Sequence, residues 1–516
     1  MANRPSSLNT RLPDAVLVAM AALIAGLWLW HAAASMVFDE MASVYFSGQP
    51  WGRLWGAWMV RETNPPLFYS LLKLWRMALP IGHWTFRALP LGIAAIGLWL
   101  FAATARRLGP WSAVLALALC AVSWSDIWQA AYLRGYGLAR LAVWVSFLGL
   151  IAALEAPERR RGWLVYGAGA LVAIHCHTTM LLWPVIATLA VMAEMALRRA
   201  PDGRVIARLI AADIAIALLS AWVLVMAVVQ LRGARAANIS WLQPLGWNDF
   251  WATCNLQLLA GGTVGSALMG ALLLAGLWRG RAMRVVRLSA LIALIALLVF
   301  KATDAVHPII SDYTLHWAFG FGALVAAASL RGHNWSWRGH GAALAIVAAV
   351  PGSGLYEMFT SEFRMVPQDL HGTVQTVAAH PGAALLASHE AEGVVLEQAC
   401  LVEWGRLPCP FPLVVLTDPR QTDNWAFGGY RGRLIPPAQA RGALGRARTV
   451  YAFSRYFYTP LQHLGLKPSN WPEVFWDDAE LIGPIPLHAF DPPGPGEPAR
   501  VPDPDAEYTG APDPDQ

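Results

Sequence analysis

The sequence predicts a polytopic α-helical membrane protein with a smaller α/β domain at its C-terminal end. Of its 516 residues, 56% are hydrophobic and only 14% are charged, a balance that soluble domains seldom show. Long apolar runs recur over residues 1–353, whereas short apolar segments alternate with amphipathic ones from about residue 354. The net charge of +5 does not point to a nucleic-acid partner, because the arginines gather beside the apolar runs.

Eleven apolar runs in the first part are candidates for transmembrane helices, since about 20 apolar residues cross a hydrocarbon core. The first run lacks a signal-peptide cleavage pattern and is interpreted as a retained helix. The runs are 15–36, 85–105, 110–130, 136–154, 163–177, 178–197, 205–230, 263–278, 286–304, 313–330 and 340–353.

Arginine-rich connections set the expected orientation of these helices. They fall at every second connection, at 105–109, 157–162, 197–204, 278–287 and 331–340. By the positive-inside rule these connections are cytoplasmic, so the other connections and the C-terminus face outward. Because the composition is that of a GC-rich bacterial genome, the sequence predicts a multi-pass protein of the bacterial inner membrane with a periplasmic C-terminus.

The C-terminal part is predicted to form a periplasmic α/β domain over residues 354–490. Three segments resemble buried strands, at 383–388, 411–418 and 449–455, with helical segments between them. The acidic, proline-rich tail 491–516 is predicted to be disordered. Cys400 and Cys409 lie in this domain and are expected either to form a disulfide in an oxidising compartment or to remain two free thiols.

The largest outward connection, 37–84, is too amphipathic for a plain linker. It begins with "FDE", in which Asp39 and Glu40 follow the first apolar run directly. Further along, "WGRLWGAWMV" predicts a tryptophan-rich helix in the membrane interface. Lys73 and Arg76 indicate that the following helix lies on the membrane rather than through it. This loop therefore holds carboxylates at the depth of the lipid headgroups.

Several motifs, in order and on one side of the membrane, resemble a known superfamily. These are "FDE", "NPPL", "FRALPLGIAAIGLWLFAATARRLG" and "YLRGYGLARL". Together they resemble the polyprenyl-phosphate-sugar-dependent membrane glycosyltransferases of the GT-C fold, in the protein O-mannosyltransferase and lipid A aminoarabinose transferase superfamily (glycosyltransferase family 39-like). The resemblance is best over 15–200. It implies transfer of a hexosyl or pentosyl group from a polyprenyl-phosphate donor to an extracytoplasmic acceptor, which is a cell-envelope glycan, lipid or protein.

Such a transfer requires a general base on the acceptor and a cation at the departing phosphate. The resemblance places the base, or an acceptor-orienting group, at Asp39, with Glu40 ranked second. The alternative for Asp39 is the N-cap of the next helix. Arg134 and Tyr136 in "YLRGYG" are implied to hold the donor phosphate or its lipid, and the alternative for Arg134 is a side chain that snorkels to the interface.

Further outward cations are candidates for contact with the donor. Lys73, Arg232 and Lys301 are expected either to bind the phosphate or to anchor the protein to lipid headgroups. One position departs from the superfamily pattern: "PIISDYTLHW" has Asp312 where an arginine is usual, and Tyr313 is kept. This difference has three possible meanings: the donor phosphate is bound by other residues, the substrate differs, or the chain is an inactive relative.

Four other polar residues of the outward connections are candidates for acceptor or metal binding. Glu62 and Asn64 precede the proline pair, where local turn chemistry is the alternative. His175 and His177 lie at a short outward turn, where ionisable groups are functional candidates. His177 with Glu62 or Asp39 would suit a divalent ion such as Mg²⁺, Mn²⁺ or Zn²⁺, and a metal-free site is the alternative.

Two other classes of function remain open at this point. A transporter or flippase for a lipid-linked substrate would carry internal repeats and charges near the membrane midplane, and the sequence shows no repeat. An inactive scaffold that recruits partners is the other. The sequence has no P-loop or dinucleotide fingerprint, in keeping with a donor activated by its lipid phosphate rather than by a nucleotide.

Overall fold

The computed structural model describes two compact units formed by interleaved parts of the chain. The first comprises Met1–Ala33, Gly52–Leu71 and Arg87–Phe363, and the second comprises Ala34–Trp51, Leu72–Phe86 and Arg364–Gln516. The residues described are 8–62, 64–121, 123–232, 244–259, 263–311, 313–332, 335–360, 369–416, 434–436, 439–445, 447–454 and 480–486. The whole of the predicted tail 491–516, and parts of 354–490, lie outside these ranges.

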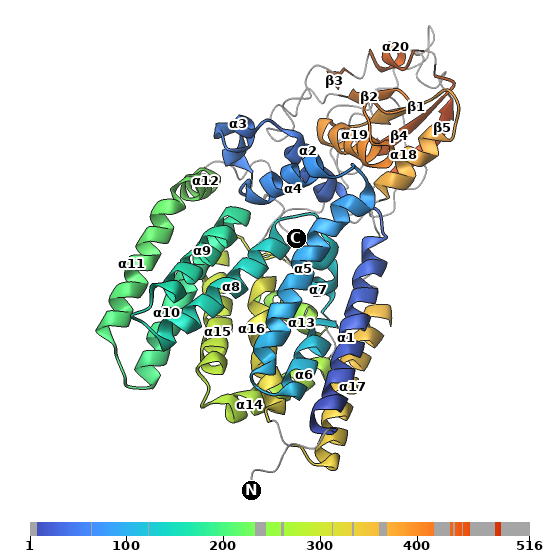
Figure 1. Ribbon diagram of the computed structural model, residues 1–516. Helices are drawn as coiled ribbons and strands as arrows, with labels where there is room; N and C mark the ends of the chain where they lie inside the picture. The colour runs from blue at the N-terminus through green and yellow to red at the C-terminus, as the bar shows by residue number, and fades with distance from the viewer. Residues whose placement is uncertain are drawn as a thin grey trace. The chain divides into compact units, whose positions relative to one another are not determined.

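Helices make up almost all of the first unit (Figure 1). The first are α1 (Leu8–Ala32), then α3 (Trp51–Leu54), η1 (Ala57–Arg61) and α4 (Leu67–Ala78) within the connection 37–84, and α5 (His83–Arg106) at its end. Of these, α3, α4 and α5 have residues in both units. Next come α6 (Pro110–Ala121), α7 (Trp124–Ala131), α8 (Tyr136–Glu155), α9 (Arg160–Cys176), η2 (Thr178–Leu181), α10 (Leu182–Leu197), α11 (Gly203–Leu219) and α12 (Ala221–Arg232). The last are α13 (Trp247–Leu259), α14 (Thr263–Gly280), α15 (Arg284–Asp304), α16 (His316–Ala327), η4 (Ala328–Leu330) and α17 (Trp337–Thr360).

The lengths and composition of these helices confirm the polytopic membrane class. In the described part of the chain, five spans are long and apolar enough to cross a bilayer: α1, α5, α8, η2 with α10, and α15. Two pairs also pass when taken together, α6 with α7 bent by 77° and α11 with α12 bent by 68°, which raises the number to seven. The count of about eleven spans stays a prediction.

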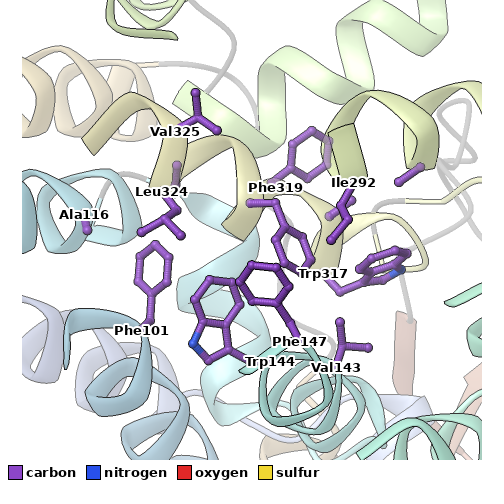
Figure 2. Close-up of a cluster of buried hydrophobic side chains, with 14 of the residues drawn as sticks. Phe101, Ala116, Val143, Trp144, Phe147, Ile292, Trp317, Phe319, Leu324 and Val325 are labelled. Atoms are coloured by element: carbon purple, nitrogen blue, oxygen red, sulfur yellow. The ribbon is translucent and has the colours of Figure 1, made fainter. Parts of the chain in front are cut away.

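Aromatic side chains fill the centre of the first unit. Trp144 and Phe147 project from α8 toward Phe321 of α16, with ring centroids 5.2 and 5.0 Å from the Phe321 ring. Figure 2 shows this cluster, where Trp144 and Phe147 lie with Phe101 and Trp317 among smaller apolar side chains. Rings at these distances pack favourably beyond the area that they bury. The cluster ties α8 to α16, and Tyr136 and His316 in the first turns of these two helices are among the residues described below.

Glycines let α8 and α9 approach each other closely. A Cβ built on Gly149 would lie 2.4 Å from the backbone nitrogen of Tyr166, and one on Gly169 would lie 2.6 Å from the carbonyl oxygen of Ala142. A Cβ on Gly162 would lie 2.5 Å from the nitrogen of Ala153. Small residues at such crossings are a common means of helix association in membranes, because they bring the backbones into contact.

Replacing Gly169 with alanine is therefore expected to push α8 and α9 apart and to lower the thermal midpoint of the purified protein by several degrees. The matched control is Gly92→Ala in α5, where an added Cβ meets nothing within 4 Å. Thermal unfolding followed by tryptophan fluorescence compares the two. Equal midpoints for both variants would contradict the close crossing of α8 and α9.

The second unit contains a five-stranded sheet, as the predicted α/β domain requires. Its strands are β1 (Ala383–Ala387), β2 (Leu413–Leu416), β3 (Leu434–Ile435), β4 (Thr449–Ser454) and β5 (Glu480–Pro486), in the order β3-β2-β1-β4-β5. All neighbours are parallel except β4 and β5. The three predicted strands are confirmed as β1, β2 and β4. Helices α18 (Leu370–Ala378), α19 (Glu390–Trp404) and α20 (Ala440–Leu444) pack on the sheet.

Part of the first large connection folds with this C-terminal domain. Helix α2 (Phe38–Gly48) packs against α19, and the backbone N–H of His371 in α18 donates to the hydroxyl of Ser35 at 3.2 Å. Near the start of α5, the rings of His83 and His371 meet edge to face at 5.4 Å. The carboxylates at the start of α2 thus belong to the same unit as the sheet.

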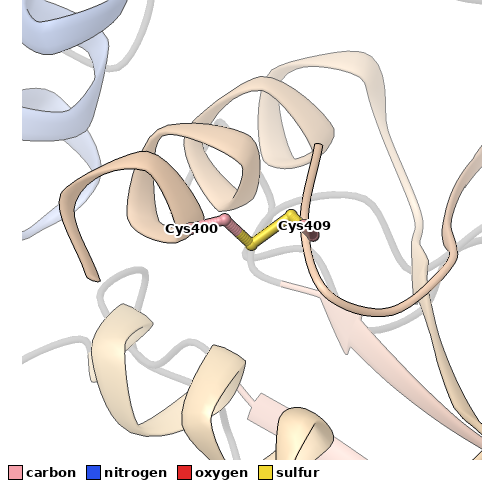
Figure 3. Close-up of a disulfide and its surroundings, with 2 residues drawn as sticks. All are labelled: Cys400 and Cys409. Atoms are coloured by element: carbon pink, nitrogen blue, oxygen red, sulfur yellow. A yellow bond between two sulfur atoms is a disulfide. The ribbon is translucent and has the colours of Figure 1, made fainter. Parts of the chain in front are cut away.

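Cys400 and Cys409 form a disulfide, with their Cα atoms 5.4 Å apart (Figure 3). It joins α19 to the loop that leads into β2. Of the two alternatives open from the sequence, the structure thus has the bonded pair. Disulfides of this kind persist in oxidising compartments.

Replacing both cysteines with serine is expected to lower the free energy of unfolding of the second unit by about 2–3 kcal/mol, because the bond closes a loop of about ten residues. Thermal unfolding of the full chain, with and without reductant, measures this. Reductant should lower the unfolding temperature of the native protein and leave that of the double variant unchanged. If reductant did not lower the unfolding temperature of the native chain, the disulfide would not be stabilising.

Candidate functional site

A buried ion pair lies at the centre of the candidate site in the first unit. Glu62 follows η1 and Arg134 lies between α7 and α8, with 3% and 8% of their surfaces exposed. The carboxylate oxygen of Glu62 is 3.8 Å from a guanidinium nitrogen of Arg134. Removing one member of such a pair leaves a buried charge, which costs far more than the pair itself contributes. The two residues therefore fix each other in place.

Tyr69, near the start of α4, links the two charges. Its hydroxyl donates to Glu62 at 3.2 Å and accepts from Arg134 at 3.1 Å. Asn64 adds a second donor to the same Glu62 oxygen at 3.3 Å. Gln230 of α12 donates to the backbone carbonyl of Glu62 and so ties α12 to the turn. The "RETNPPL" segment thus builds a polar network around one arginine, which local turn chemistry alone would not require.

The backbone around Arg134 is positioned by two neighbours of the motif. A Cβ on Gly135 would lie 2.8 Å from the carbonyl oxygen of Cys176, so glycine lets the start of α8 approach the end of α9. Arg87, only 2% exposed, donates to the carbonyl of Ala131 at 2.8 Å and holds the end of α7. In the "YLRGYG" motif, Arg134 and Tyr136 therefore flank the glycine that makes the close contact between α8 and α9.

Three tyrosines stack beside this network. The ring of Tyr132 lies 6.1 Å from that of Tyr136 and 5.6 Å from that of Tyr313, with interplanar angles of 5° and 17°. Tyr136 also lies 5.1 Å from the ring of His177. Nδ1 of His177 accepts from the backbone N–H of Thr179 at 3.2 Å, so this histidine caps η2. Tyr313 belongs to the motif in which Asp312 departs from the pattern; Asp312 itself is outside the described residues.

A small cavity opens between these aromatic rings. The space free of protein atoms there is about 230 Å³, including the part open to its surroundings. Most of the polar residues that line it are neutral. Among the described lining residues, Arg140 carries a formal charge. The polar lining residues are Gln129, Tyr136, Arg140, His177, Thr179, Tyr313 and Thr314.

A second polar cluster adjoins this cavity and is absent from the sequence-based prediction. Arg140 donates to Asp126, and Nε2 of His316 lies 3.2 Å from the Asp126 carboxylate and 2.8 Å from the Arg140 guanidinium. These residues come from α7, α8 and α16. The sequence held a signal for them, because ionisable residues inside apolar runs are functional candidates. The prediction took those runs as plain transmembrane helices.

Asp39 and Glu40 lie in the first turn of α2 in the second unit. Glu40 is 2% exposed, and its carboxylate accepts from the backbone N–H of Val37 at 3.0 Å. The N-cap position is Val37, so Glu40, rather than Asp39, supplies the side chain that caps the helix. Asp39 is only partly buried, and its carbonyl accepts from the Ser43 hydroxyl at 3.0 Å.

Lys73 and Arg76 also lie in the second unit, at the other end of α2. Lys73 donates to the carbonyl of Gln49 at 2.8 Å, and Arg76 donates to the carbonyl of Val44 at 3.2 Å. Cations at a helix C-terminus satisfy its unpaired carbonyls and its dipole. Desolvation, together with the nearby Arg76, lowers the pKa of Lys73. Lys73 is thus bound to the protein backbone, and phosphate binding at this lysine stays a prediction.

The other predicted cations are distributed differently. Lys301, near the end of α15, donates to the carbonyl of Leu245 and lies 4.0 Å from the buried carboxylate of Asp304. Its ammonium also lies 5.5 Å from the centroid of the Trp247 ring. These contacts join α13 to α15. Arg232 ends α12, but its side chain is outside the described residues.

The histidine and metal predictions meet a different geometry. Nδ1 of His175 is 2.8 Å from the carbonyl of Leu171, one turn back in its own helix, so it donates there. Within the described ranges, no group of three or more His, Cys, Asp or Glu side chains is placed to hold a metal ion. Glu62 is instead surrounded by Tyr69, Asn64 and Arg134. In this arrangement the Glu62 carboxylate neutralises the Arg134 guanidinium, and a metal ion at Glu62 stays a prediction.

Comparison of the sequence with protein-family models finds no match, and comparison with curated proteins finds none either. The structure does match solved structures. The crystal structure of ArnT from Cupriavidus metallidurans in the apo state aligns with a TM-score of 0.55 at 14% identity, over 84% of this chain and 92% of that chain. The structure of the same protein bound to undecaprenyl phosphate gives a TM-score of 0.41 at 13% identity, over 84% of this chain and 92% of that chain. The arabinofuranosyltransferase AftD from Mycobacteria gives 0.43 at 16% identity, over 75% of this chain and 30% of that chain.

The match to apo ArnT extends over most of both chains and shows a shared fold. The predicted fold class is thereby confirmed: the chain has the GT-C fold of membrane glycosyltransferases, with a C-terminal α/β domain. A shared fold does not assign an activity, which has to be argued from the site.

Proposed function

We propose that this GT-C-fold protein is a glycosyltransferase that moves a sugar from a polyprenyl-phosphate donor to an acceptor on the outer face of the bacterial inner membrane. The observation that carries the proposal is the buried Glu62–Tyr69–Arg134 network. It holds one guanidinium and one phenol hydroxyl, the groups that bind a phosphate well, next to stacked aromatic rings. The acceptor is a cell-envelope glycan, lipid or protein.

The proposed step is a displacement at the anomeric carbon of the sugar. The acceptor hydroxyl oxygen forms a bond to that carbon while the bond from the carbon to the phosphate oxygen breaks. The hydroxyl proton passes to a general base, the role that the sequence resemblance implies for Asp39, and the electron pair of the broken bond stays on the polyprenyl phosphate. Arg134, oriented by Glu62 and Tyr69, stabilises the charge that develops on the phosphate.

Two features support the outward location of this chemistry. By the positive-inside rule, the arginine-rich connections are expected on the inner side, which supports an outward location for Arg134, His177 and the C-terminal domain. The disulfide between Cys400 and Cys409 fits an oxidising compartment. Membrane lipids would surround the helices, whose exposed faces carry apolar side chains such as Leu164, Ile214 and Leu218.

The test is turnover by the purified full-length chain in liposomes. Undecaprenyl phosphate, the lipid bound to ArnT in one of the compared structures, carries the donor sugars, and a cell-envelope fraction supplies acceptors. Mass spectrometry is expected to show free undecaprenyl phosphate and a glycosylated acceptor. The Arg134→Gln protein is the control and should release far less lipid phosphate.

Two outcomes would contradict the proposal. A flippase would move the intact donor between leaflets without releasing undecaprenyl phosphate. A scaffold would leave both the position and the structure of the donor unchanged. Neither result depends on the choice of acceptor, because release of undecaprenyl phosphate reports cleavage of the donor directly.

A further inference from the structure

We infer that the cavity at the break between α6 and α7 is the pocket for the donor sugar, and that it selects a neutral sugar. This inference rests on the proposed function and names the class of sugar, which that proposal leaves open. The cavity lies in the first unit, and the space free of protein atoms there is about 310 Å³, including the part open to its surroundings. Its lining includes Cys120, Ser123, Asp126, Arg140, His316 and Gly320.

The unsatisfied nitrogen of His316 points to a ligand. His316 is 2% exposed, and among the described residues its Nδ1 has no hydrogen-bond partner. Leaving such a group unpaired in a buried site is costly, so a partner is expected. Nε2 lies near both Asp126 and Arg140, so Nδ1 acts as donor in one tautomer and as acceptor in the other. A sugar hydroxyl can both donate and accept, and it therefore satisfies either tautomer.

The charge balance of the cavity selects a neutral ligand. Asp126 and Arg140 form an ion pair and cancel each other, and the remaining polar lining groups are an imidazole, a hydroxyl and a thiol. An added carboxylate or ammonium on the sugar would enter a buried site without a counter-charge, which is strongly unfavourable. An isoprenoid chain is also a poor fit, because it would leave Nδ1 of His316 unpaired.

The position of Arg140 connects this cavity to the phosphate network. Arg140 lines both this cavity and the one beside the tyrosine stack. Gly135 is the N-cap of α8 and directly follows Arg134 in the sequence. Arg140 lies five residues further along the helix. Five helical residues rise about 7–8 Å, a span that one sugar ring can bridge. A phosphate at Arg134 would therefore place its sugar beside Tyr136 and Arg140.

Gly320 gives a way to fill the cavity without disturbing its polar groups. It lines the cavity, and a Cβ added there meets nothing within 4 Å. Gly322 is on the same helix, also accepts a Cβ without contact within 4 Å, and does not belong to the lining. Gly320→Leu and Gly322→Leu are thus a matched pair, in which only the first is expected to occupy the sugar pocket.

The experiment measures binding to the full-length chain in lipid nanodiscs by native mass spectrometry. The probes are undecaprenyl phosphate alone and its conjugates with glucose, with a uronic acid and with an amino sugar. We expect the native chain to prefer the glucose conjugate over the two charged conjugates. Gly320→Leu should weaken binding of the glucose conjugate at least tenfold and leave undecaprenyl phosphate unchanged, whereas Gly322→Leu should alter neither. His316→Phe, which keeps a planar ring and removes both nitrogens, should weaken binding of the glucose conjugate about tenfold.

Three results would overturn the inference while the proposed function stands. Gly320→Leu could weaken undecaprenyl phosphate and its conjugate equally, which would assign the cavity to the isoprenoid chain. A preference for a charged sugar would exclude the neutral class. No change in any variant would show that the cavity takes no part in donor binding. By contrast, a native chain that binds neither lipid would contradict the proposed function itself.

Discussion

Replacing Glu62 with glutamine is expected to destabilise the protein by about 3–5 kcal/mol, because the Arg134 guanidinium would lose its carboxylate in a buried site. Glu62 and Arg134 are 3% and 8% exposed, so solvent offers little compensation. Donor cleavage should be lost as well, since Glu62 orients Arg134 directly and through Tyr69. Thermal unfolding and the liposome turnover assay measure the two effects separately.

The paired variant and a surface pair serve as controls for this prediction. Glu62→Gln combined with Arg134→Gln removes both charges and should recover much of the lost stability, while donor cleavage stays absent. Asp14→Asn breaks the ion pair with Arg106, whose members are 44% and 47% exposed, and should cost less than about 1 kcal/mol. If Glu62→Gln were as mild as Asp14→Asn, Glu62 and Arg134 would not form the buried pair described here.

Replacing Asp39 with asparagine is expected to lower the turnover number by about 10²–10⁴, the usual effect of losing a general base. The cap of α2 should be unaffected, because Glu40 rather than Asp39 supplies it. Glu40→Ala is the matched neighbour and should show the opposite pattern, with a loss of about 1 kcal/mol in stability and near-native turnover. The reversed pattern, in which Glu40→Ala stops turnover and Asp39→Asn does not, would move the base to Glu40.

Much of the fold was predictable because its signals are local. The apolar runs marked the helices, and β1, β2 and β4 stood out as short apolar segments. The strand β5, "ELIGPIP", was not predicted, since its glycine and two prolines are unfavourable in a strand and only pairing with β4 explains it. Nor could the pattern of α2 show that this helix packs on α19, because amphipathicity indicates a buried face without naming the partner.

The candidate site was predictable only where residues lie in recognisable motifs. Glu62, Asn64, Arg134 and Tyr136 were predicted from "RETNPPL" and "YLRGYG", and the structure brings Glu62, Asn64 and Arg134 into one network. Tyr69 was missed because a tyrosine in an amphipathic helix is unremarkable until its hydroxyl is placed. Asp126, Arg140 and His316 are distant in sequence and lie within or beside apolar runs. Only the packing of α7, α8 and α16 unites them.

The central claim, sugar transfer from a lipid-linked donor, is tested most directly in cells. Mass spectrometry would compare envelope glycolipids and glycoproteins in cells with the native gene, without it, and with Asp39→Asn. We expect the deletion to remove one hexose- or pentose-sized increment from a defined acceptor and to accumulate the matching polyprenyl-phosphate sugar. The native gene should restore the increment, and Asp39→Asn should not. Identical profiles with and without the gene, with no accumulated donor, would contradict the proposed transfer.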